Sequence, residues 1–183
     1  MKKPKAIIFD RDGTLIEHVP YLADPSSVVL LPDAREALRT AQDQEAMLFL
    51  HTNQSGIGRG YFNPEQADAC NHQLIQLLDL GPKPFERICI APEAPEEPSL
   101  YRKPSPAFVL EIIRDSGFLP EEICYIGDRG SDLATAHAAG TRGIGVTTGL
   151  DDLKAELDAL GLGDTYPVFD SILFAMHYLF PES

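Results

Sequence analysis

The feature that most constrains this chain is the regular alternation of short apolar runs with longer stretches of helical pattern. The runs are AIIF, MLFLHT, RICIA, ICYIG and GIGV, each bounded by turn residues. Short runs of this kind are typical of buried parallel strands. Strands that alternate with helices predict an α/β fold, with a doubly wound parallel sheet in a three-layer α/β/α arrangement.

Start and stop signals mark the helical stretches between the runs. Asn63-Pro64 predicts a helix start, with Asn63 as N-cap, and Ser105-Pro106 repeats that pattern. Ser131 is a candidate N-cap and Gly140 the matching stop. The segments predicted to be helical are 33–44, 63–80, 105–117, 131–140, 151–160 and 170–180.

Length, charge and cysteine count narrow the class of protein. The chain has 183 residues, near the size of one domain, and neither a repeat nor a linker divides it, so we expect a single domain over residues 1–183. A formal net charge of −13 argues against nucleic acid and acidic membranes as partners. Three cysteines without a CxxC pair, and a first apolar run too short for a signal peptide, favour the cytoplasm. A monomer is our working expectation.

Two carboxylates follow the first apolar run. Side chains at i and i+2 share a face of a strand, so Asp10 and Asp12 should point together while Arg11 points away. A rise of about 3.3 Å per residue separates their backbones by roughly 7 Å, which leaves room for a reacting group. Gly13 permits a sharp exit from the strand. An ordinary solvated turn is the alternative interpretation.

Polar groups also follow the second run. The hydroxyl of Thr52, the amide of Asn53 and the free N–H groups of the segment through Gln54 and Ser55 could form an anion cradle. The glycines that come next match neither the dinucleotide fingerprint nor the phosphate loop, because position 61 is Tyr and no G-K-[ST] follows.

Arg102 and Lys103 precede the helix predicted from residue 105. A lysine beside a helix N-terminus suits a phosphate, although surface lysines beside prolines are also common. We expect the two to lie at a strand end, so that their side chains point in different directions. The proline-rich segment before them, residues 91–102, is either a surface connection or a substrate-facing loop.

A second pair of carboxylates follows the ICYIG run. Asp128 lies at the strand end, and Asp132 lies four residues later in the first turn of the next helix. Four carboxylates at one sheet edge would repel one another and raise their pKa values, which a hard divalent cation such as Mg²⁺ reverses. With Thr52 and Lys103 opposite, the set indicates phosphoryl transfer, in which one carboxylate attacks phosphorus and another handles the proton.

FDRDGTLI, HTNQSG, RKP and GDRGSD, in this order and spacing, resemble the four motifs of the haloacid dehalogenase (HAD) superfamily of phosphatases. The resemblance implies a Rossmann-like core and an aspartyl phosphate formed on Asp10. It implies that Asp12 acts as general acid and then base, and that Thr52 and Lys103 hold the phosphoryl oxygens. The implied Mg²⁺ ligands are Asp10, the main-chain carbonyl of Asp12, and Asp128, with Asp132 as a further ligand or close neighbour.

Within the superfamily, TNQSGIGRGYF with RKP and GDR is similar to the phosphatases of D-glycero-D-manno-heptose 1,7-bisphosphate and of histidinol phosphate. Candidate substrate-binding residues on this basis are His18, Val19, Pro20, Tyr21, Asn53, Gln54, Ser55, Arg102 and Arg129. That subgroup usually carries a zinc loop of cysteines and a histidine, whereas here Cys89 stands alone, so we expect no zinc. No insertion is large enough for a cap domain, so we expect an open site with residues 17–24 and 91–102 at its rim.

Four functions are weighed. The first is a magnesium-dependent phosphatase of a small sugar phosphate, with removal of the 7-phosphate of heptose bisphosphate foremost. The second is a histidinol-phosphate phosphatase, in which Glu93, Glu96 or Glu97 would pair with the ammonium group. The third, a nucleic acid 3′-phosphatase, is opposed by the net charge. The fourth, a non-catalytic binding module, would require the loss of Asp10 or Asp128, and both are present.

Overall fold

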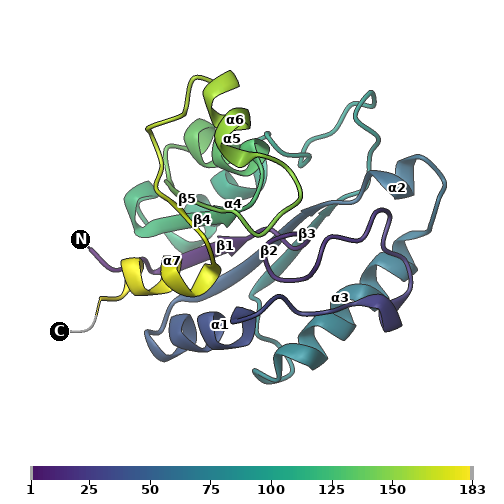
Figure 1. Cartoon of the computed structure of the whole chain (residues 1–183), viewed down its shortest axis with the longest axis horizontal. Coiled ribbons are helices and arrows are strands. Elements are labelled where there is room, and N and C mark those ends of the chain that lie inside the picture. Colours follow the sequence, from purple (N-terminus) through teal and green to yellow (C-terminus); the bar gives the residue numbers. More distant parts are fainter. Residues whose placement is uncertain (1, 182–183) are drawn as a thin grey trace.

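A computed structural model of the chain describes residues 2–181 and has one six-stranded sheet at its centre (Figure 1). All paired strands are parallel, in the order β3-β2-β1-β4-β5-β6. The strands are β1 Ala6–Phe9, β2 Met47–Asn53, β3 Arg87–Ala91, β4 Ile123–Gly127, β5 Arg142–Val146 and β6 Val168–Phe169. The helices are α1 Ala34–Asp43, α2 Ser55–Gly58, α3 Pro64–Leu78, α4 Ala107–Ser116, α5 Gly130–Ala139, α6 Leu153–Ala159 and α7 Ile172–Leu179.

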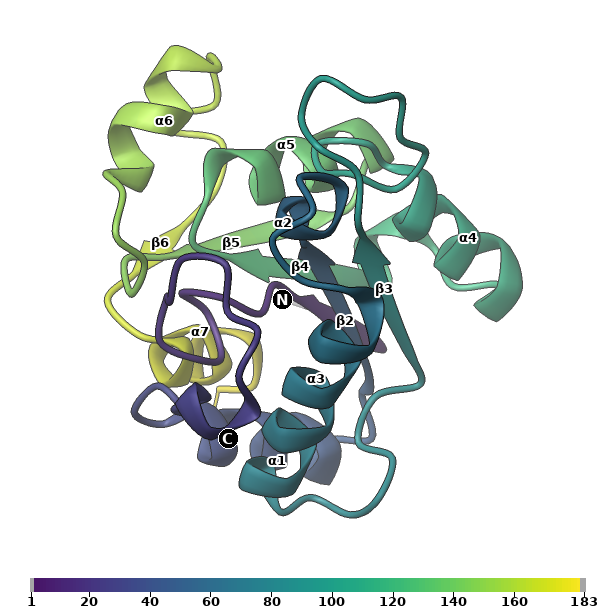
Figure 2. The same cartoon turned by 90° about the vertical axis from the view of Figure 1, so that its right-hand side faces the viewer.

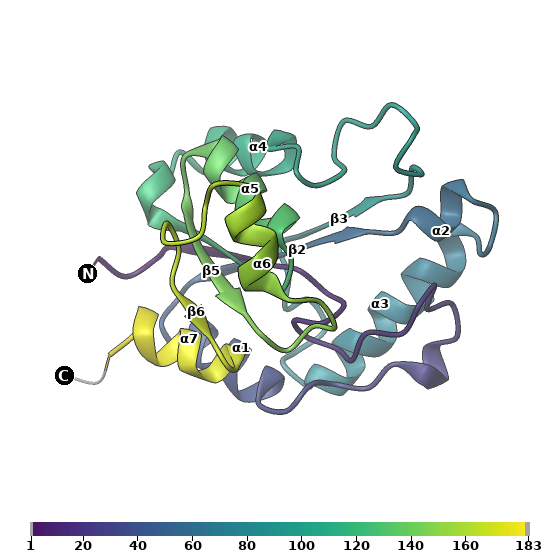
Figure 3. The same cartoon turned by 45° about the horizontal axis from the view of Figure 1, so that its top comes forward.

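Helices cover both faces of the sheet, because alternate residues of each strand point to opposite sides. In β1, Ile7 and Phe9 join a core formed with α1, α3 and α7. Ala6 and Ile8 join a second core formed with α4 and α5. The two helix layers lie on opposite sides of the sheet in Figure 1 and Figure 3, and α6 packs beside α5. The structure therefore confirms the doubly wound, three-layer α/β/α prediction.

The strand order places a switch point between β1 and β4. The chain moves from β1 to β2 and β3 on one side, and then returns to β4, β5 and β6 on the other. Phe9, the last residue of β1, is in register with Leu50 of β2 and Ile126 of β4, and these two neighbours extend beyond it to Asn53 and Gly127. In open sheets of this kind, ligands bind outside the carboxyl ends of the strands at the switch point. Figure 2 turns this end toward the viewer.

Two predicted helix caps need correction, and α6 and α7 begin two residues later than their predicted segments, at Leu153 and Ile172. Helix α4 begins at Ala107, with Pro106 in the N-cap position, because the hydroxyl of Ser105 accepts the Ala107 amide from outside the helix. Helix α5 begins at Gly130, so Ser131 lies inside it and is not its cap. The Asn63 cap of α3 is confirmed as a reciprocal pair with Gln66. The two-residue β6 and the four-residue α2 were not predicted, since such short elements carry little periodicity.

The edge at the carboxyl ends carries loops and no inserted domain within residues 2–181. Between β1 and α1 the chain forms isolated bridges at Ile16 and a short 3₁₀ turn at Pro25–Ser27. In the same part of the chain, no helix is both long and apolar enough to cross a membrane. The assignment of residues 1–183 to a single domain stays a prediction.

Candidate active site

Two adjoining cavities at the carboxyl ends of the strands collect the predicted site residues. One, of about 220 Å³, is lined by Asp10, Asp12, His18, Thr52, Asn53, Ser55, Arg102, Lys103, Asp128 and Arg129, together with Ser131. The other, of about 310 Å³, adds Val19, Pro20, Tyr21 and Gln54. Motifs that lie more than a hundred residues apart in the chain therefore meet at one place. The predicted metal-binding residue Asp132 lies directly beneath, fully buried.

The floor of the smaller cavity is a buried carboxylate–ammonium cluster. Lys103 Nζ donates to Asp10 Oδ1 and, over 2.6 Å, to Asp132 Oδ1. Burial, together with the carboxylates of Asp132 and Asp128, raises the pKa of Asp10 well above its usual value despite the lysine. Burial opposes the ammonium, but Asp10 and Asp132 raise the pKa of Lys103 well above its usual value. The lysine therefore stays charged beside the candidate nucleophile.

Asp128 completes a group of three carboxylates. One oxygen from each of Asp10, Asp128 and Asp132 lies within 4.8 Å of the others. Asp128 is 1% exposed, and burial followed by repulsion from Asp132 raises its pKa to about 6. Thr14 Oγ1 donates to it over 3.2 Å. Oxygen-only ligands in this number are what a hard cation such as Mg²⁺ prefers, so the residues present fit the predicted metal.

Two glycines give Asp128 the space that it occupies. Gly13 has a φ of +86°, and a Cβ built there would lie 2.4 Å from Asp128 Oδ2. A Cβ on Gly149, in the loop after β5, would lie 1.9 Å from the same oxygen. Gly13 was predicted as a sharp turn, whereas Gly149 was missed, because it lies outside the four motifs and carries no functional group.

Asp12 is held by more donors than its motif suggests. Arg11 Nε and Nη2 donate to its two carboxylate oxygens over 3.0 and 3.1 Å, and Gln54 Nε2 donates to Oδ2 over 3.0 Å. The prediction that Arg11 points away from Asp12 is therefore wrong. The Arg11 side chain is fully buried, and its third nitrogen donates to Asn71 Oδ1 of α3, which turns the guanidinium back toward Asp12.

Thr52 lies beside this carboxylate. Its Oγ1 is 3.3 Å from Asp12 Oδ2 and accepts a hydrogen bond of 2.7 Å from Gln54 Nε2. Thr52, Gln54 and Asp12 thus form a connected set of polar groups at the end of β2, and the anion cradle stays a prediction. The hydroxyl and the lysine ammonium line the same cavity, as a phosphoryl group would require.

Arg102 and Lys103 lie in the loop between β3 and α4, so the prediction of a strand end is wrong for this pair. This loop arches over the sheet edge on the same end of the molecule as α2 (Figure 3). Arg102 Nη1 donates to the Glu93 carbonyl over 3.2 Å, and the side chain is half-buried at the cavity wall. Burial and the nearby Arg59 lower the pKa of Arg102, while Glu93 and Glu96 act in the opposite direction. An anion at this position would be favoured by the two arginines and opposed by the two glutamates.

Arg129 is already engaged by acidic side chains that the sequence did not single out. Its guanidinium pairs with Asp151 over 2.6 Å and with Glu156 over 3.0 Å. Glu156 also accepts the Gly130 amide over 2.5 Å. Arg129 therefore lines the cavity while its charge is largely neutralised by the α6 segment.

The comparisons with known proteins agree with this geometry. A family model described as HAD-hydrolase-like matches residues 100–173. The D-glycero-D-manno-heptose-1,7-bisphosphate 7-phosphatase of Chlorobaculum tepidum is 32% identical over 162 residues, 81% of each chain. The D-glycero-beta-D-manno-heptose-1,7-bisphosphate 7-phosphatase of Haemophilus ducreyi is 33% identical over 146 residues, 75% of this chain and 80% of the relative.

Among solved structures, the D,D-heptose 1,7-bisphosphate phosphatase of B. bronchiseptica, determined in complex with magnesium and phosphate, superposes with a TM-score of 0.87. It is 26% identical, and the match covers 98% of this chain and 99% of that one. The likeness therefore extends over nearly the whole chain, and the four motifs lie within its length.

Proposed function

Since the chain belongs to the HAD-like hydrolases and is a phosphatase of that family, we propose that it removes the 7-phosphate of D-glycero-D-manno-heptose 1,7-bisphosphate through an aspartyl phosphate. The single observation that carries the chemistry is the buried cluster of Asp10, Lys103, Asp128 and Asp132 at the floor of the cavity. The relatives' shared name supports the choice of substrate.

In the proposed first step, a carboxylate oxygen of Asp10 attacks phosphorus, and the bond from phosphorus to the ester oxygen breaks. The leaving oxygen takes its proton from Asp12, which Arg11 and Gln54 hold at the cavity wall. In the second step, Asp12 accepts a proton from water, whose oxygen attacks phosphorus. The acyl phosphate bond breaks, and Asp10 and inorganic phosphate are released. Lys103 and Thr52 would balance the charge on the transferred phosphoryl oxygens.

The proposed cofactor is Mg²⁺, held by carboxylates of Asp10 and Asp128 and by the Asp12 carbonyl. When bound, it would polarise the phosphoryl group and offset the repulsion among the acids. Asp132 already accepts from Lys103 and from the Arg129 amide, which supports its role as a neighbour that positions the lysine. Zinc is not part of the proposal, because residues 89–104 offer one cysteine and no histidine, whereas a structural zinc ion takes about four ligands.

The rim supports a substrate with two anionic ends. Lys103 lies at the cavity floor, while Arg102 lies at its wall with Arg59 nearby, so two cationic positions flank the opening. The adjoining cavity of about 310 Å³, lined by His18 to Tyr21 and by Gln54 and Ser55, could hold the sugar between two phosphates. Histidinol phosphate, with one phosphate and an ammonium group, would leave Arg102 without an anion.

The test is a panel of phosphate esters assayed for phosphate release with and without Mg²⁺. The panel contains heptose 1,7-bisphosphate, heptose 7-phosphate, histidinol phosphate and a 3′-phosphorylated oligonucleotide. The proposal expects the highest kcat/KM for the bisphosphate and loss of the 7-phosphate alone. A higher kcat/KM for histidinol phosphate or the oligonucleotide would replace the proposed substrate.

A further inference from the structure

Lys103 lies on a loop, yet its ammonium must stay in place to within a fraction of an ångström. The loop is tied to β2 by two side chains of that strand. Asn53 receives the Lys103 amide on Oδ1 over 3.0 Å and donates from Nδ2 to the Lys103 carbonyl over 3.3 Å. His51, two residues earlier on the same side of β2, bonds through Nε2 to the Tyr101 carbonyl over 2.8 Å. The side chains of His51 and Asn53, two residues apart on β2, thus hold main-chain groups of Tyr101 and Lys103, two residues apart on the loop.

The imidazole of His51 is held on both sides. It is fully buried, packs 5.0 Å from the Phe108 ring between centroids, and approaches the Tyr125 hydroxyl with Nδ1 at 3.0 Å. A carbonyl oxygen can only accept, so Nε2 must carry the hydrogen and Nδ1 must accept from Tyr125. Burial, followed by the Lys103 charge, lowers the pKa of His51 to about 3. The ring is therefore neutral and its tautomer is fixed.

The position does not need a polar residue for packing. Neighbouring side chains on this face, including Phe49, Phe108 and Tyr125, form an apolar core. Burying an imidazole there costs free energy unless both nitrogens are hydrogen-bonded, and an apolar side chain would carry no such cost. One bond of His51 leads out of the core to the loop that carries Lys103, and the other joins the ring to Tyr125 of β4 within the core.

We propose that His51 is a positioning residue for catalysis, which holds the Tyr101 carbonyl so that Lys103 reaches Asp10 and Asp132, with Tyr125 fixing its tautomer. The inference rests on the proposed function, since Lys103 matters only if it faces a transferred phosphoryl group. It assigns a role to His51, the first residue of HTNQSG, which the sequence analysis left without one, and to Tyr125, which lies outside the four motifs.

Two amide substitutions separate the two bonds. In His51→Gln the amide nitrogen can reach the position of Nε2 and keep the bond to Tyr101. In His51→Asn the shorter amide reaches only the position of Nδ1 and keeps the bond to Tyr125. We expect His51→Asn to lower kcat about tenfold, in line with the cost of small misplacements, and His51→Gln to stay within about threefold of wild type. KM should change little in both variants.

Phe49→Leu is the matched control, because Phe49 is two residues earlier on the same face of β2 and is as deeply buried. It should lower the unfolding temperature and leave kcat near wild type. A double-mutant cycle then tests the route through the lysine. In a Lys103→Met background, assayed with an activated aryl phosphate, His51→Asn should cost less than about twofold.

The inference would be overturned if His51→Gln and His51→Asn lowered kcat equally. It would also be overturned if His51→Asn still lowered kcat tenfold in the Lys103→Met background. Hydrogen exchange of the amides at 101–103 gives a readout that needs no activity. Exchange should be faster in His51→Asn than in wild type and unchanged in His51→Gln, and unchanged exchange in both would overturn it too. If the wild type hydrolyses none of the panel, the proposed function fails while this exchange result still decides whether His51 holds the loop.

Discussion

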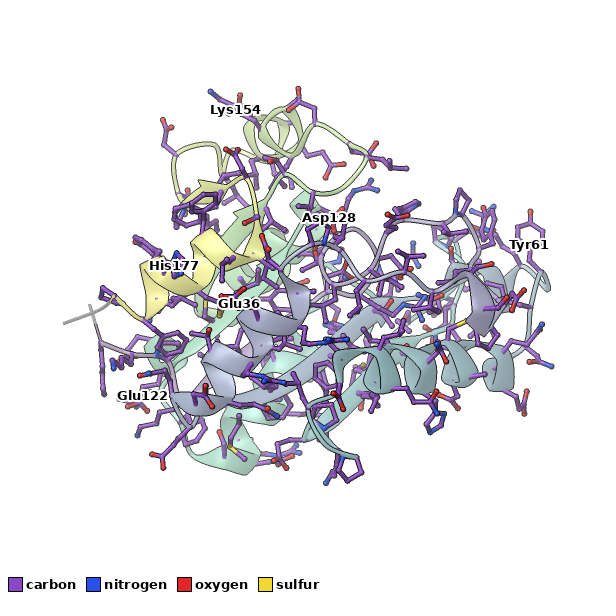
Figure 4. All side chains as sticks on the ribbon, turned by 60° about the horizontal axis from the view of Figure 1, so that its bottom comes forward. Glu36, Tyr61, Glu122, Asp128, Lys154 and His177 are labelled. Carbon is purple, nitrogen blue, oxygen red and sulfur yellow. The ribbon has the colours of Figure 1, made fainter. Side chains whose placement is uncertain are left out.

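At the two ends of β4, the pKa of a buried carboxylate is shifted in opposite directions. Glu122 lies just before the strand and is 4% exposed, while Asp128 lies just after it and is 1% exposed (Figure 4). Hydrogen bonds from Lys2, the Leu119 amide and Lys5 lower the pKa of Glu122 to about 2. Burial and then Asp132 raise the pKa of Asp128 to about 6.

The difference lies in how the charges are balanced. At the amino end, one acid is matched by two lysines at 2.5 and 3.1 Å, so the charges are satisfied within the protein. At the carboxyl end, four aspartates share Lys103 and Arg11, so negative charge is in excess. We propose that the arrangement at the carboxyl end, which is unfavourable alone, becomes favourable when a cation and a substrate bind, so that one end serves stability and the other serves binding and chemistry.

The largest effect should come from exchanging one carboxylate for an amide at each end. Asp10→Asn should lower kcat by at least about 10⁴-fold, because an amide cannot attack phosphorus. Glu122→Gln should leave kcat unchanged. Rates of phosphate release and thermal unfolding curves for both variants provide the check. Asp10→Asn should unfold no earlier than wild type, since it removes a buried acid with a raised pKa. Turnover near wild type would remove Asp10 from the nucleophile role.

The effect of Mg²⁺ should be confined to the acidic cluster at the carboxyl end of β4. Chelation should stop turnover without unfolding the protein, and Mg²⁺ at a hundred times its Kd should add about 2.7 kcal/mol of stability. The raised pKa of Asp128 means that its buried charge destabilises the metal-free protein fully above about pH 6 and less as pH falls toward 3.8. The gain in unfolding temperature on adding Mg²⁺ should therefore be larger at pH 7.5 than at pH 5. A gain that is equal at both would contradict the charge imbalance.

Arg102→Ala tests the cation at the rim of the acidic end. For a bisphosphate, the loss of a charged hydrogen bond should cost about 1.5–3 kcal/mol in kcat/KM, mostly through KM. A monophosphate should be almost unaffected. Lys154→Ala, an exposed lysine on α6, is the matched control and should change neither. If both substrates lose equally, Arg102 serves the transferred phosphoryl group and the argument for a second phosphate fails.

The smallest effect should come from protonation of Glu122, at the amino end of β4, at low pH. The folded pKa of Glu122, about 2, is below its usual 4.5, so its contribution to stability is present above about pH 4.5 and is lost as pH falls through about 2. Glu122→Gln should lower the unfolding temperature at pH 7, and the difference from wild type should disappear near pH 2. A difference that stays constant with pH would show that packing, and not charge, is lost.

The sequence predicted the parts of the molecule that depend on local pattern. Strand runs, the switch-point site and the residues from Asp10 to Asp128 follow from periodicity and from four motifs. One contact that it missed joins distant segments: Arg11 turns toward Asp12 because Asn71 of α3 meets it, 60 residues later in the chain, and such a contact leaves no trace in local spacing. The start of α5 at Gly130 was missed for a local reason. The Asp132 carboxylate accepts the Arg129 amide three residues earlier, whereas the sequence analysis took Ser131 as the cap.

The glycines around Asp128 have a consequence for how this enzyme can vary. Any amino-acid substitution at Gly13 or Gly149 introduces at least a Cβ atom that overlaps a carboxylate oxygen of Asp128. By contrast, Gly81 and Gly161 have open space around a would-be Cβ, and only their positive φ angles resist replacement. In a library of all substitutions selected for activity, no variant should therefore survive at Gly13 or Gly149, whereas variants should survive at Gly81 and Gly161. Gly149 would then mark the active site as sharply as an aspartate does, although it has no chemical group to lose.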